Sequence, residues 1–184
     1  MIEVEVKARA NEQTLQRIKA LGAVFLKEEN HIDIYFNSPL RDFRKTDEAL
    51  RIRVKEEGAR LTYKGPKLDS ETKSRQELTV KIDSPERMTE VLRALDFVPS
   101  AEVRKRRTKY SLDDVTFALD DVQGLGLFLE IEARGEADWE GQKRKVISLL
   151  SQLGLGESIR KSYLELLEEQ SKEKQSRESK EKEE

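Results

Sequence analysis

The chain opens with IEVEVKAR at residues 2–9, in which apolar and charged side chains alternate without a break. Strict alternation puts the apolar side chains on one face of a β-strand and the charged side chains on the other. The pattern returns along the chain, and we expect further strands at residues 31–36, 49–56, 59–64, 75–82, 98–110, 115–121 and 127–133. Short turn signals such as Glu57-Gly58 favour an antiparallel sheet that curls or closes, rather than a regular alternation of strands and helices.

Helical spacing of apolar side chains occurs at residues 12–21, 85–95, 139–153 and 159–167. Asn11 is expected to cap the first helix, and Ser84 followed by Pro85 is typical of a helix start. Residues 170–184 contain no apolar side chain, so they cannot bury area that would offset the entropy of ordering. We expect a charged, disordered or frayed tail there.

The composition excludes several classes of function. Lys and Arg number 35 and Asp and Glu 37, so the net charge is −2, although 39% of residues are charged. A near-neutral total argues against a simple basic nucleic-acid binder. The absence of cysteine excludes disulfides, thiol nucleophiles and cysteine zinc sites, and the single histidine, His31, excludes motifs that need two. No apolar run is long enough for a membrane helix and no signal peptide is recognisable, so we expect a soluble cytoplasmic protein.

The polar faces of the expected strands are unusually rich in ions. On a single strand such a face is usually just exposed to water. If the faces converge inside a closed barrel, however, they form a polyanion site, in which carboxylates hold hard divalent cations and Lys and Arg hold phosphate. We favour this interpretation. The side chains concerned are Glu3, Glu5, Lys7, Arg51, Arg53, Lys55, Lys64, Arg75, Glu77, Lys81, Lys105, Arg107, Lys109, Asp120, Glu130 and Glu132.

Several motifs together resemble a known family. Residues 3–7, EVEVK, match the ExExK signature of the CYTH superfamily, the triphosphate tunnel metalloenzymes. Further matches follow in the same order and spacing, most like the CyaB-type class IV adenylyl cyclase branch, over residues 1–167. They are HIDIYFNSP at 31–39, TDEALRIR at 46–53, LTYKGPK at 61–67, KSRQEL at 73–78, LDDVQGLGLFLEIE at 119–132 and SYLELL at 162–167.

The resemblance implies an α+β fold, a closed eight-stranded antiparallel barrel that forms a tunnel with helices packed outside, as a single domain over residues 1–169. It implies two Mg²⁺ or Mn²⁺ ions, and a small-molecule triphosphate as the partner rather than nucleic acid or a membrane. The protein would be a monomer or a homodimer. The implied metal ligands are Glu3, Glu5, Glu130 and Glu132, with Asp120 as a further candidate. The implied triphosphate-binding residues are Lys7, Arg51, Arg53, Lys64, Arg75, Lys105 and Arg107, of which Lys7, Lys105 and Arg107 are the catalytic candidates.

The activity implied first is that of an adenylyl cyclase, which converts ATP to cyclic AMP and pyrophosphate. The same residues would serve a thiamine triphosphatase or an inorganic triphosphatase, and a non-catalytic polyphosphate-binding module would also contain them. A single-strand nucleic-acid binder needs aromatic stacking platforms, and only 6% of residues are aromatic. No P-loop motif occurs. His31, Asp33 and Tyr35 share one strand face, for which we expect a structural or tunnel-mouth role, and the role of Glu77 is left open.

Overall fold

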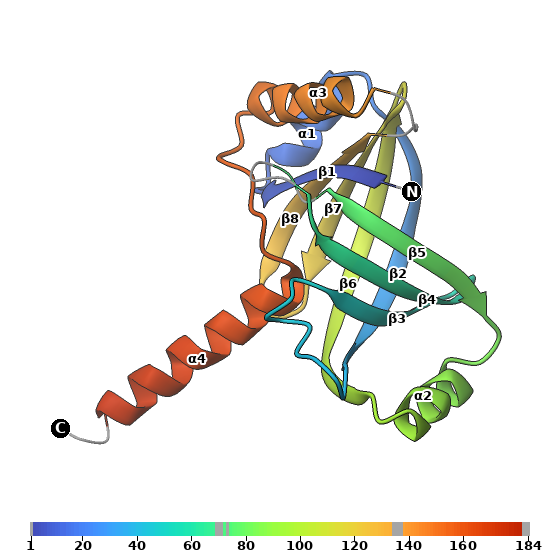
Figure 1. Ribbon diagram of the computed structural model, residues 1–184. Coiled ribbons are helices and arrows are strands. Elements are labelled where there is room, and N and C mark those ends of the chain that lie inside the picture. Colours follow the sequence, from blue (N-terminus) through green and yellow to red (C-terminus); the bar gives the residue numbers. More distant parts are fainter. Residues whose placement is uncertain (1, 69–71, 73, 134–137, 182–184) are drawn as a thin grey trace.

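The computed structural model describes residues 2–68, 72, 74–133 and 138–181 (Figure 1). Within these residues there are eight strands and four helices. The strands are β1 (Ile2–Arg9), β2 (Val24–Asn37), β3 (Ala49–Lys55), β4 (Gly58–Lys67), β5 (Arg75–Ile82), β6 (Val98–Leu112), β7 (Val115–Val122) and β8 (Gly126–Ala133). The helices are α1 (Thr14–Ala20), α2 (Pro85–Ala94), α3 (Trp139–Gln152) and α4 (Tyr163–Glu181).

All pairs among the described strands are antiparallel, in the order β1-β5-β4-β3-β2-β6-β7-β8. The ends of this order meet through β1. Among the described residues, β1 pairs with β8 over six residues but with β5 at two positions, Ile2 with Gln76 and Glu3 with Arg75. The sheet therefore curls around a central space, and the β1–β5 contact forms a short seam. The expected α+β class, antiparallel sheet and external helices are confirmed.

The apolar core lies outside the curled sheet, between its outer face and the helices. Val4 and Val6 of β1 are completely buried, and they pack with Ile18 of α1 and Val146 of α3. Figure 1 shows α1 and α3 together against one end of the sheet. Alternation along β1 therefore buries its valines against the helices and turns Glu5 and Lys7 to the inside.

A third helix, α2, covers another part of the outer face. Leu92 of α2 packs against Phe36 of β2 and Ile52 of β3. The Ser84 hydroxyl accepts a hydrogen bond from the Arg87 backbone N–H at 3.1 Å, so the expected cap of this helix is confirmed. The apolar faces of β2 and β3 are thus covered, which leaves their charged faces inside the sheet.

Several boundaries differ from those expected, including the end of β4, which continues to Lys67 rather than stopping at residue 64. β2 begins at Val24 rather than at residue 31, because the long pairing with β6 extends the strand past its alternating part. α1 begins at Thr14, and Asn11 instead accepts from the Gln13 N–H in the preceding turn. α4 begins only at Tyr163 and continues to Glu181, through most of the segment expected to be a tail. The domain boundary at residue 169 stays a prediction.

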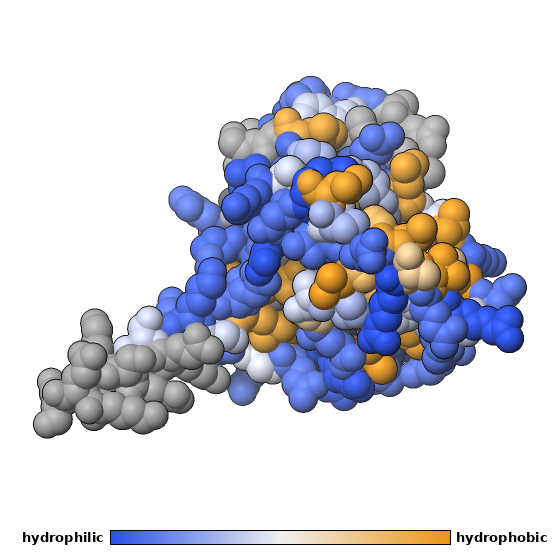
Figure 2. Space-filling view, turned by 60° about the horizontal axis from the view of Figure 1, so that its bottom comes forward, coloured by the Kyte–Doolittle hydropathy of each residue, from blue (hydrophilic) through white to orange (hydrophobic). Residues whose placement is uncertain are grey.

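The face of the molecule shown in Figure 2 is mostly hydrophilic, with separate hydrophobic patches. Leu78 and Val80 on the outer face of β5 are more than half exposed. No helix in the described ranges combines the length and the apolar character needed to cross a bilayer.

Candidate functional site

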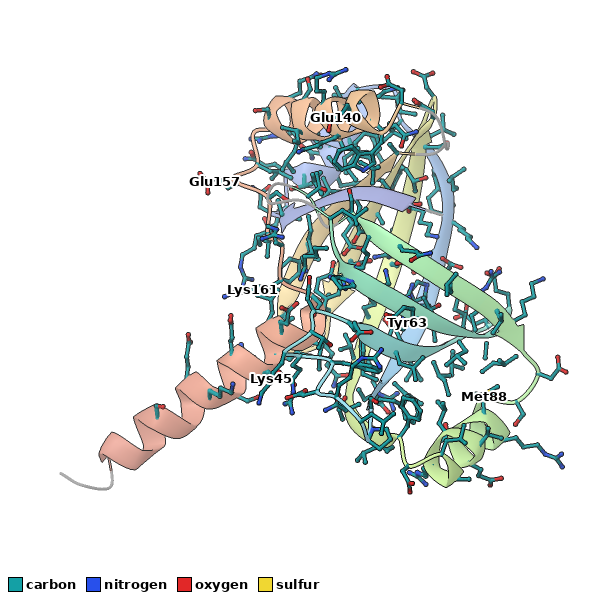
Figure 3. All side chains as sticks on the ribbon, in the orientation of Figure 1. Lys45, Tyr63, Met88, Glu140, Glu157 and Lys161 are labelled. Carbon is teal, nitrogen blue, oxygen red and sulfur yellow. The ribbon has the colours of Figure 1, made fainter. Side chains whose placement is uncertain are left out.

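The inner face of the curled sheet brings together ionic side chains from all eight strands. The strand registers align them: Asp33 of β2 lies opposite Arg53 of β3, and Lys64 of β4 lies opposite Glu77 of β5. On the other side, Arg107 of β6 lies opposite Asp120 of β7, and further pairs join β8 to β1. Figure 3 shows side chains crowding the space between the strands. The convergence inferred from the sequence is therefore present.

Asp33 orients two arginines toward the central space. Its carboxylate accepts two hydrogen bonds from Arg53, from Nε and Nη2, both at 2.6 Å, and one from Arg51 at 3.4 Å. Asp33 is 1% exposed, and burial by itself would raise the pKa of its carboxyl group. The charges of Arg51 and Arg53 outweigh that effect and hold the pKa well below its usual range. Asp33 is therefore an anion that holds the guanidinium groups of Arg51 and Arg53 in place.

Asp120 has the same role for a second pair of cations. Arg107 donates to it from Nε at 2.6 Å and from Nη2 at 2.5 Å, and the Lys105 ammonium donates at 2.8 Å. Arg107 Nη2 also donates to Glu130. Burial, together with the charge of Arg107, lowers the pKa of Lys105 to about 8. Lys105 is thus still mostly protonated at neutral pH.

Several of these groups line a cavity of about 160 Å³ inside the sheet, and residues of the segment 43–49 and of the start of α4 complete its lining. Tyr35, Phe43, Ala49, Tyr163 and Leu164 contribute the apolar part of its wall. Six of the seven residues expected to bind triphosphate line the cavity: Arg51, Arg53, Lys64, Arg75, Lys105 and Arg107. The expected metal ligands Glu5 and Glu130 line it too.

Three of the expected site residues lie outside this lining. Lys7 and Asp120 are fully buried behind the cavity wall, and the lining, as far as the chain is described, does not include them or Glu132. The side chain of Glu3 lies outside the described part of the structure, although its backbone pairs with that of Arg75 at the seam.

The carboxylates of β1 and β8 fit a divalent cation by their chemistry. Glu5 and Glu132 lie directly opposite each other across the β1–β8 ladder, and Glu130 lies two residues before Glu132 on the same face. Like charges directly opposite each other on a sheet destabilise it unless a cation neutralises them, and carboxylate oxygens are the ligands that Mg²⁺ and Mn²⁺ prefer. In the described residues no three such side chains yet converge at metal-binding distance. Glu5, Glu130 and Glu132 are nevertheless the set that would hold a metal.

The segment before α4 attaches to the back of this site. The Ile159 N–H donates to the Lys7 carbonyl at 2.6 Å, and the Lys7 ammonium donates to the carbonyl of Lys161, which Figure 3 labels just before α4. The Tyr163 hydroxyl donates to Asp120 at 2.8 Å. Lys7, expected to bind the triphosphate, thus holds the C-terminal segment in this structure.

A separate ionic cluster lies farther along β2. Glu29, 4% exposed, pairs with Lys27 at 2.7 Å, Lys55 at 3.0 Å and Lys109 at 3.4 Å. His31, 1% exposed, lies between this cluster and the arginines, with Nε2 3.4 Å from Glu29. Burial and the charges of Arg53, Arg107 and Lys105 lower the pKa of His31 to about 2. The imidazole is therefore neutral at physiological pH, and the structural or tunnel-mouth role expected for it stays a prediction.

Sequence reasoning underestimated two residues. Asp33 shares a face with His31 and Tyr35, and that alternation could have paired it with the arginines of the next strand. Tyr163 lies inside the SYLELL match, but no local pattern indicates that its hydroxyl reaches Asp120, 43 residues earlier. Contacts of that range depend on how the C-terminal segment folds back.

A family model for the CYTH domain matches residues 1–163, which is most of the chain. The chain belongs to the CYTH family. This confirms the resemblance found in the motifs. CYTH proteins are metal-dependent, and they bind triphosphates as small-molecule substrates.

Individual CYTH relatives resemble the chain over most of its length. A Methanocaldococcus jannaschii protein named as a candidate adenylate cyclase is 42% identical over 90% of this chain and 98% of its own. The structure of the PH1819 protein of Pyrococcus horikoshii matches with a TM-score of 0.85 and 41% identity, over 91% of this chain and 99% of that one. A Hippeastrum protein, described as a candidate adenylyl cyclase with a dominant triphosphatase activity, shares the fold with a TM-score of 0.65 and 23% identity, over 88% and 93% of the two chains.

Proposed function

We propose that this protein binds the triphosphate of ATP inside its curled sheet and, with a divalent metal, converts ATP to cyclic AMP and pyrophosphate. The observation that carries the proposal is the joint presence, around one cavity, of the six expected cationic side chains, a seventh from Arg44, and the carboxylates Glu5 and Glu130. Such an arrangement fits a chain of phosphates with its metal. The 42% identical relative named as a candidate adenylate cyclase supports the choice of reaction. Full closure of the tunnel along the β1–β5 seam is part of the proposal.

The cations act by holding the phosphates and by neutralising the leaving group. Arg51 and Arg53, fixed by Asp33, would grip phosphate oxygens from one wall, and Lys105 and Arg107, fixed by Asp120, from another. Preorganised donors of this kind need no reorganisation during the reaction, which is why they stabilise developing charge well. The arginines remain charged at every physiological pH.

In the proposed reaction the ribose 3′-oxygen attacks the α-phosphorus and loses its proton. The bond from the α-phosphorus to the bridging oxygen breaks, and pyrophosphate leaves with that electron pair. Mg²⁺ or Mn²⁺ held by Glu5, Glu130 and Glu132, two ions by our expectation, would supply a Lewis acid that acidifies the attacking hydroxyl and offsets phosphate charge. The nucleoside would face the cavity mouth, where Phe43 and Leu164 line the wall.

Hydrolysis of a triphosphate is the second candidate, with thiamine triphosphate or inorganic tripolyphosphate as substrate. One observation favours it: most of the side chains that line the cavity are charged, whereas among the described lining residues Tyr35, Phe43, Ala49, Tyr163 and Leu164 are the ones that offer apolar surface to an organic group. Water would then attack the terminal phosphorus instead. The same cations and carboxylates serve both reactions, because the main difference is which phosphorus lies in line with a nucleophile.

The deciding experiment incubates the protein with Mg²⁺ or Mn²⁺ and, separately, ATP, thiamine triphosphate and tripolyphosphate, and identifies the products by mass. Cyclic AMP with pyrophosphate supports the first candidate. Orthophosphate release without a cyclic product from ATP supports hydrolysis. Binding of all three without turnover would indicate a non-catalytic polyphosphate-binding module and would refute both reactions.

The metal requirement is tested by EDTA and by one substitution. EDTA should abolish turnover, and Mg²⁺ or Mn²⁺ should restore it. Glu130→Gln, nearly isosteric, should lose at least about 2–3 kcal/mol of transition-state stabilisation while the protein stays folded. Glu140→Gln is the matched control, because Glu140 is exposed on α3, away from the interior of the sheet (Figure 3). Full activity in EDTA, or equal rates for the two variants, would contradict the assignment.

A further inference from the structure

Tyr163, the first residue of α4, is the point at which the C-terminal segment reaches the ionic site. It is 5% exposed, and its hydroxyl donates to Asp120 Oδ2 at 2.8 Å. The same oxygen accepts from the Lys105 ammonium at 2.8 Å and from Arg107 Nη2 at 2.5 Å. The Tyr163 phenol is thus a neutral hydrogen-bond donor to the buried Asp120 carboxylate. The other two donors, Lys105 and Arg107, are residues proposed to bind triphosphate.

The ring of Tyr163 contacts the same cations. The Lys7 ammonium lies 4.3 Å from the ring centroid and the Lys105 ammonium 4.8 Å from it. Both distances are within the range in which the electron-rich face of an aromatic ring attracts a cation. Phe128 packs edge-on behind the ring, with the centroids 5.2 Å apart. The ring therefore faces the cations and has an apolar support behind it.

The backbone around Tyr163 is fixed independently of these contacts. Ser162 and Glu165 form a reciprocal cap at the start of α4: the Ser162 N–H donates to the Glu165 carboxylate at 2.6 Å, and the Glu165 N–H donates to the Ser162 hydroxyl at 3.2 Å. Just before it, the Ile159 N–H is bonded to the Lys7 carbonyl at 2.6 Å. Tyr163 is therefore presented to Asp120 from a rigid helix start.

We propose that Tyr163 is a positioning residue of the triphosphate site. Its hydroxyl fixes the carboxylate of Asp120 in the orientation that presents Lys105 and Arg107 to the cavity, and its ring, which lies in the cavity wall, holds Lys7 and Lys105. That the positioned cations bind triphosphate rests on the proposed function. The effect of Tyr163 on the orientation of Arg107 does not rest on it. Through this contact the start of α4 becomes part of the binding site rather than a cover over it.

The effect of Tyr163 on triphosphate binding is tested by the affinity for tripolyphosphate. Calorimetry measures this affinity without divalent metal, so that no turnover occurs. Tyr163→Phe keeps the ring and removes only the hydroxyl. Because hydrogen bonds to charged groups are strong, we expect it to weaken binding by about tenfold. Tyr110→Phe is the matched control: Tyr110 is also 5% exposed but packs in the outer core, and binding should stay within about twofold of wild type. Equal affinities for wild type and Tyr163→Phe would overturn this part.

A double-mutant cycle separates positioning from a general loss of packing. If Tyr163 acts through Asp120, Tyr163→Phe should have almost no further effect on tripolyphosphate affinity in an Asp120→Asn background. Additive effects would mean that the hydroxyl acts by another route and would overturn the proposal. Thermal unfolding of each variant shows that the comparison is made between folded proteins.

The side-chain Nε–H signal of Arg107 in nitrogen–proton NMR tests the orientation without any ligand. Tyr163→Phe should shift or broaden this signal, because Arg107 Nε donates to Asp120, and Tyr110→Phe should leave it unchanged. An unchanged signal in Tyr163→Phe would refute the positioning role. If the wild-type protein bound no triphosphate at all, the proposed function would fail, and the Arg107 signal would still decide this inference.

Discussion

At the scale of single residues, the interior of this protein consists of cations held in place by buried carboxylates. Asp33 accepts two hydrogen bonds from Arg53 and one from Arg51, and Asp120 holds Lys105 and Arg107 in the same way. A buried carboxylate deprived of its partners is strongly unfavourable, so each group is needed for the stability of the other. Removing one cation should therefore affect both ligand affinity and folding.

Arg53→Ala should weaken tripolyphosphate binding by about tenfold or more, because a bidentate phosphate ligand is lost. It should also lower the melting temperature, since Asp33 is left with Arg51 alone. Arg9→Ala is the control: Arg9 is exposed, and its guanidinium donates to the Leu125 carbonyl. Calorimetry well below the melting temperature measures the affinities. Equal losses for both variants would indicate a diffuse electrostatic surface rather than an enclosed site.

His31 should make the stability of the protein depend on pH. Its pKa in the folded state is about 2, below the usual 6.5, because it is buried among Arg53, Arg107 and Lys105. Between these two values the unfolded chain binds a proton that the folded protein does not, so stability is lost as the pH falls below 6.5. Between pH 7 and pH 5 the free energy of unfolding should fall by about 2 kcal/mol more in wild type than in His31→Gln.

Urea unfolding of both proteins at the two pH values measures this difference. Other groups titrate alike in the two chains, so their contributions cancel in the comparison. Parallel losses in wild type and His31→Gln would mean that the buried imidazole gains a proton in the folded state, for example by pairing with Glu29, which lies 3.4 Å from Nε2.

At the scale of elements, α4 has two parts with different surroundings. Its first turns pack through Tyr163, Leu164 and Leu167 against Val103, Val122 and Phe128. Figure 1 shows the rest of the helix leaving the curled sheet and extending away from it. A single helix without tertiary contacts is marginally stable in water, so its outer turns add little to the fold.

Truncation after Glu169 should therefore leave the melting temperature and the turnover almost unchanged. Truncation after Gly156 is the informative contrast, because it removes Ile159, Lys161 and Tyr163, which contact Lys7 and Asp120. That variant should lose triphosphate binding. Differential scanning calorimetry and the product assay measure both outcomes. A large fall in melting temperature or turnover on truncation after Glu169 would mean that the outer turns of α4 dock on the site.

At the scale of the whole molecule, the seam between β1 and β5 is the weakest part of the curled sheet. In the part of the chain that the structure describes, Ile2 with Gln76 and Glu3 with Arg75 are the only pairs there. Glu5 and Arg75 line the cavity from the two sides of the seam, so a metal–triphosphate complex would bridge it. A ligand that binds only the folded state stabilises it, and most of all where it joins parts that otherwise separate.

Hydrogen exchange should therefore slow at the amides of residues 2–5 and 75–77 when Mg²⁺ and a non-hydrolysable triphosphate analogue are added. Amides of α3, which packs on the outer face, should slow less. Mass spectrometry of peptic fragments measures both regions in one experiment. Uniform slowing, or slowing confined to α3, would contradict a ligand bound across the seam.

The alternation of side chains was sufficient to predict most of the strands and the division into an apolar outer face and an ionic inner face. In IEVEVKAR the apolar residues lie on one face of the strand and the charged residues on the other, because successive side chains of a strand point in opposite directions. For the same reason six of the seven cationic residues of the cavity could be predicted from their strands, whereas Arg44 lies outside any strand. The cap at Ser84 was predictable because it depends on residues adjacent in the chain.

Only the tertiary structure decided which contacts each of these side chains makes. Lys7 and Arg53 both point inward by alternation, yet Lys7 is turned to the carbonyl of Lys161 whereas Arg53 lines the cavity. Asp120 and Glu130 are both inward carboxylates, yet Glu130 lines the cavity whereas Asp120 is buried and accepts from the Tyr163 hydroxyl. Strand periodicity fixes the side of the sheet to which a residue points. Its partner there depends on strand order, register and the return of the C-terminal segment, which are contacts between residues far apart in the chain.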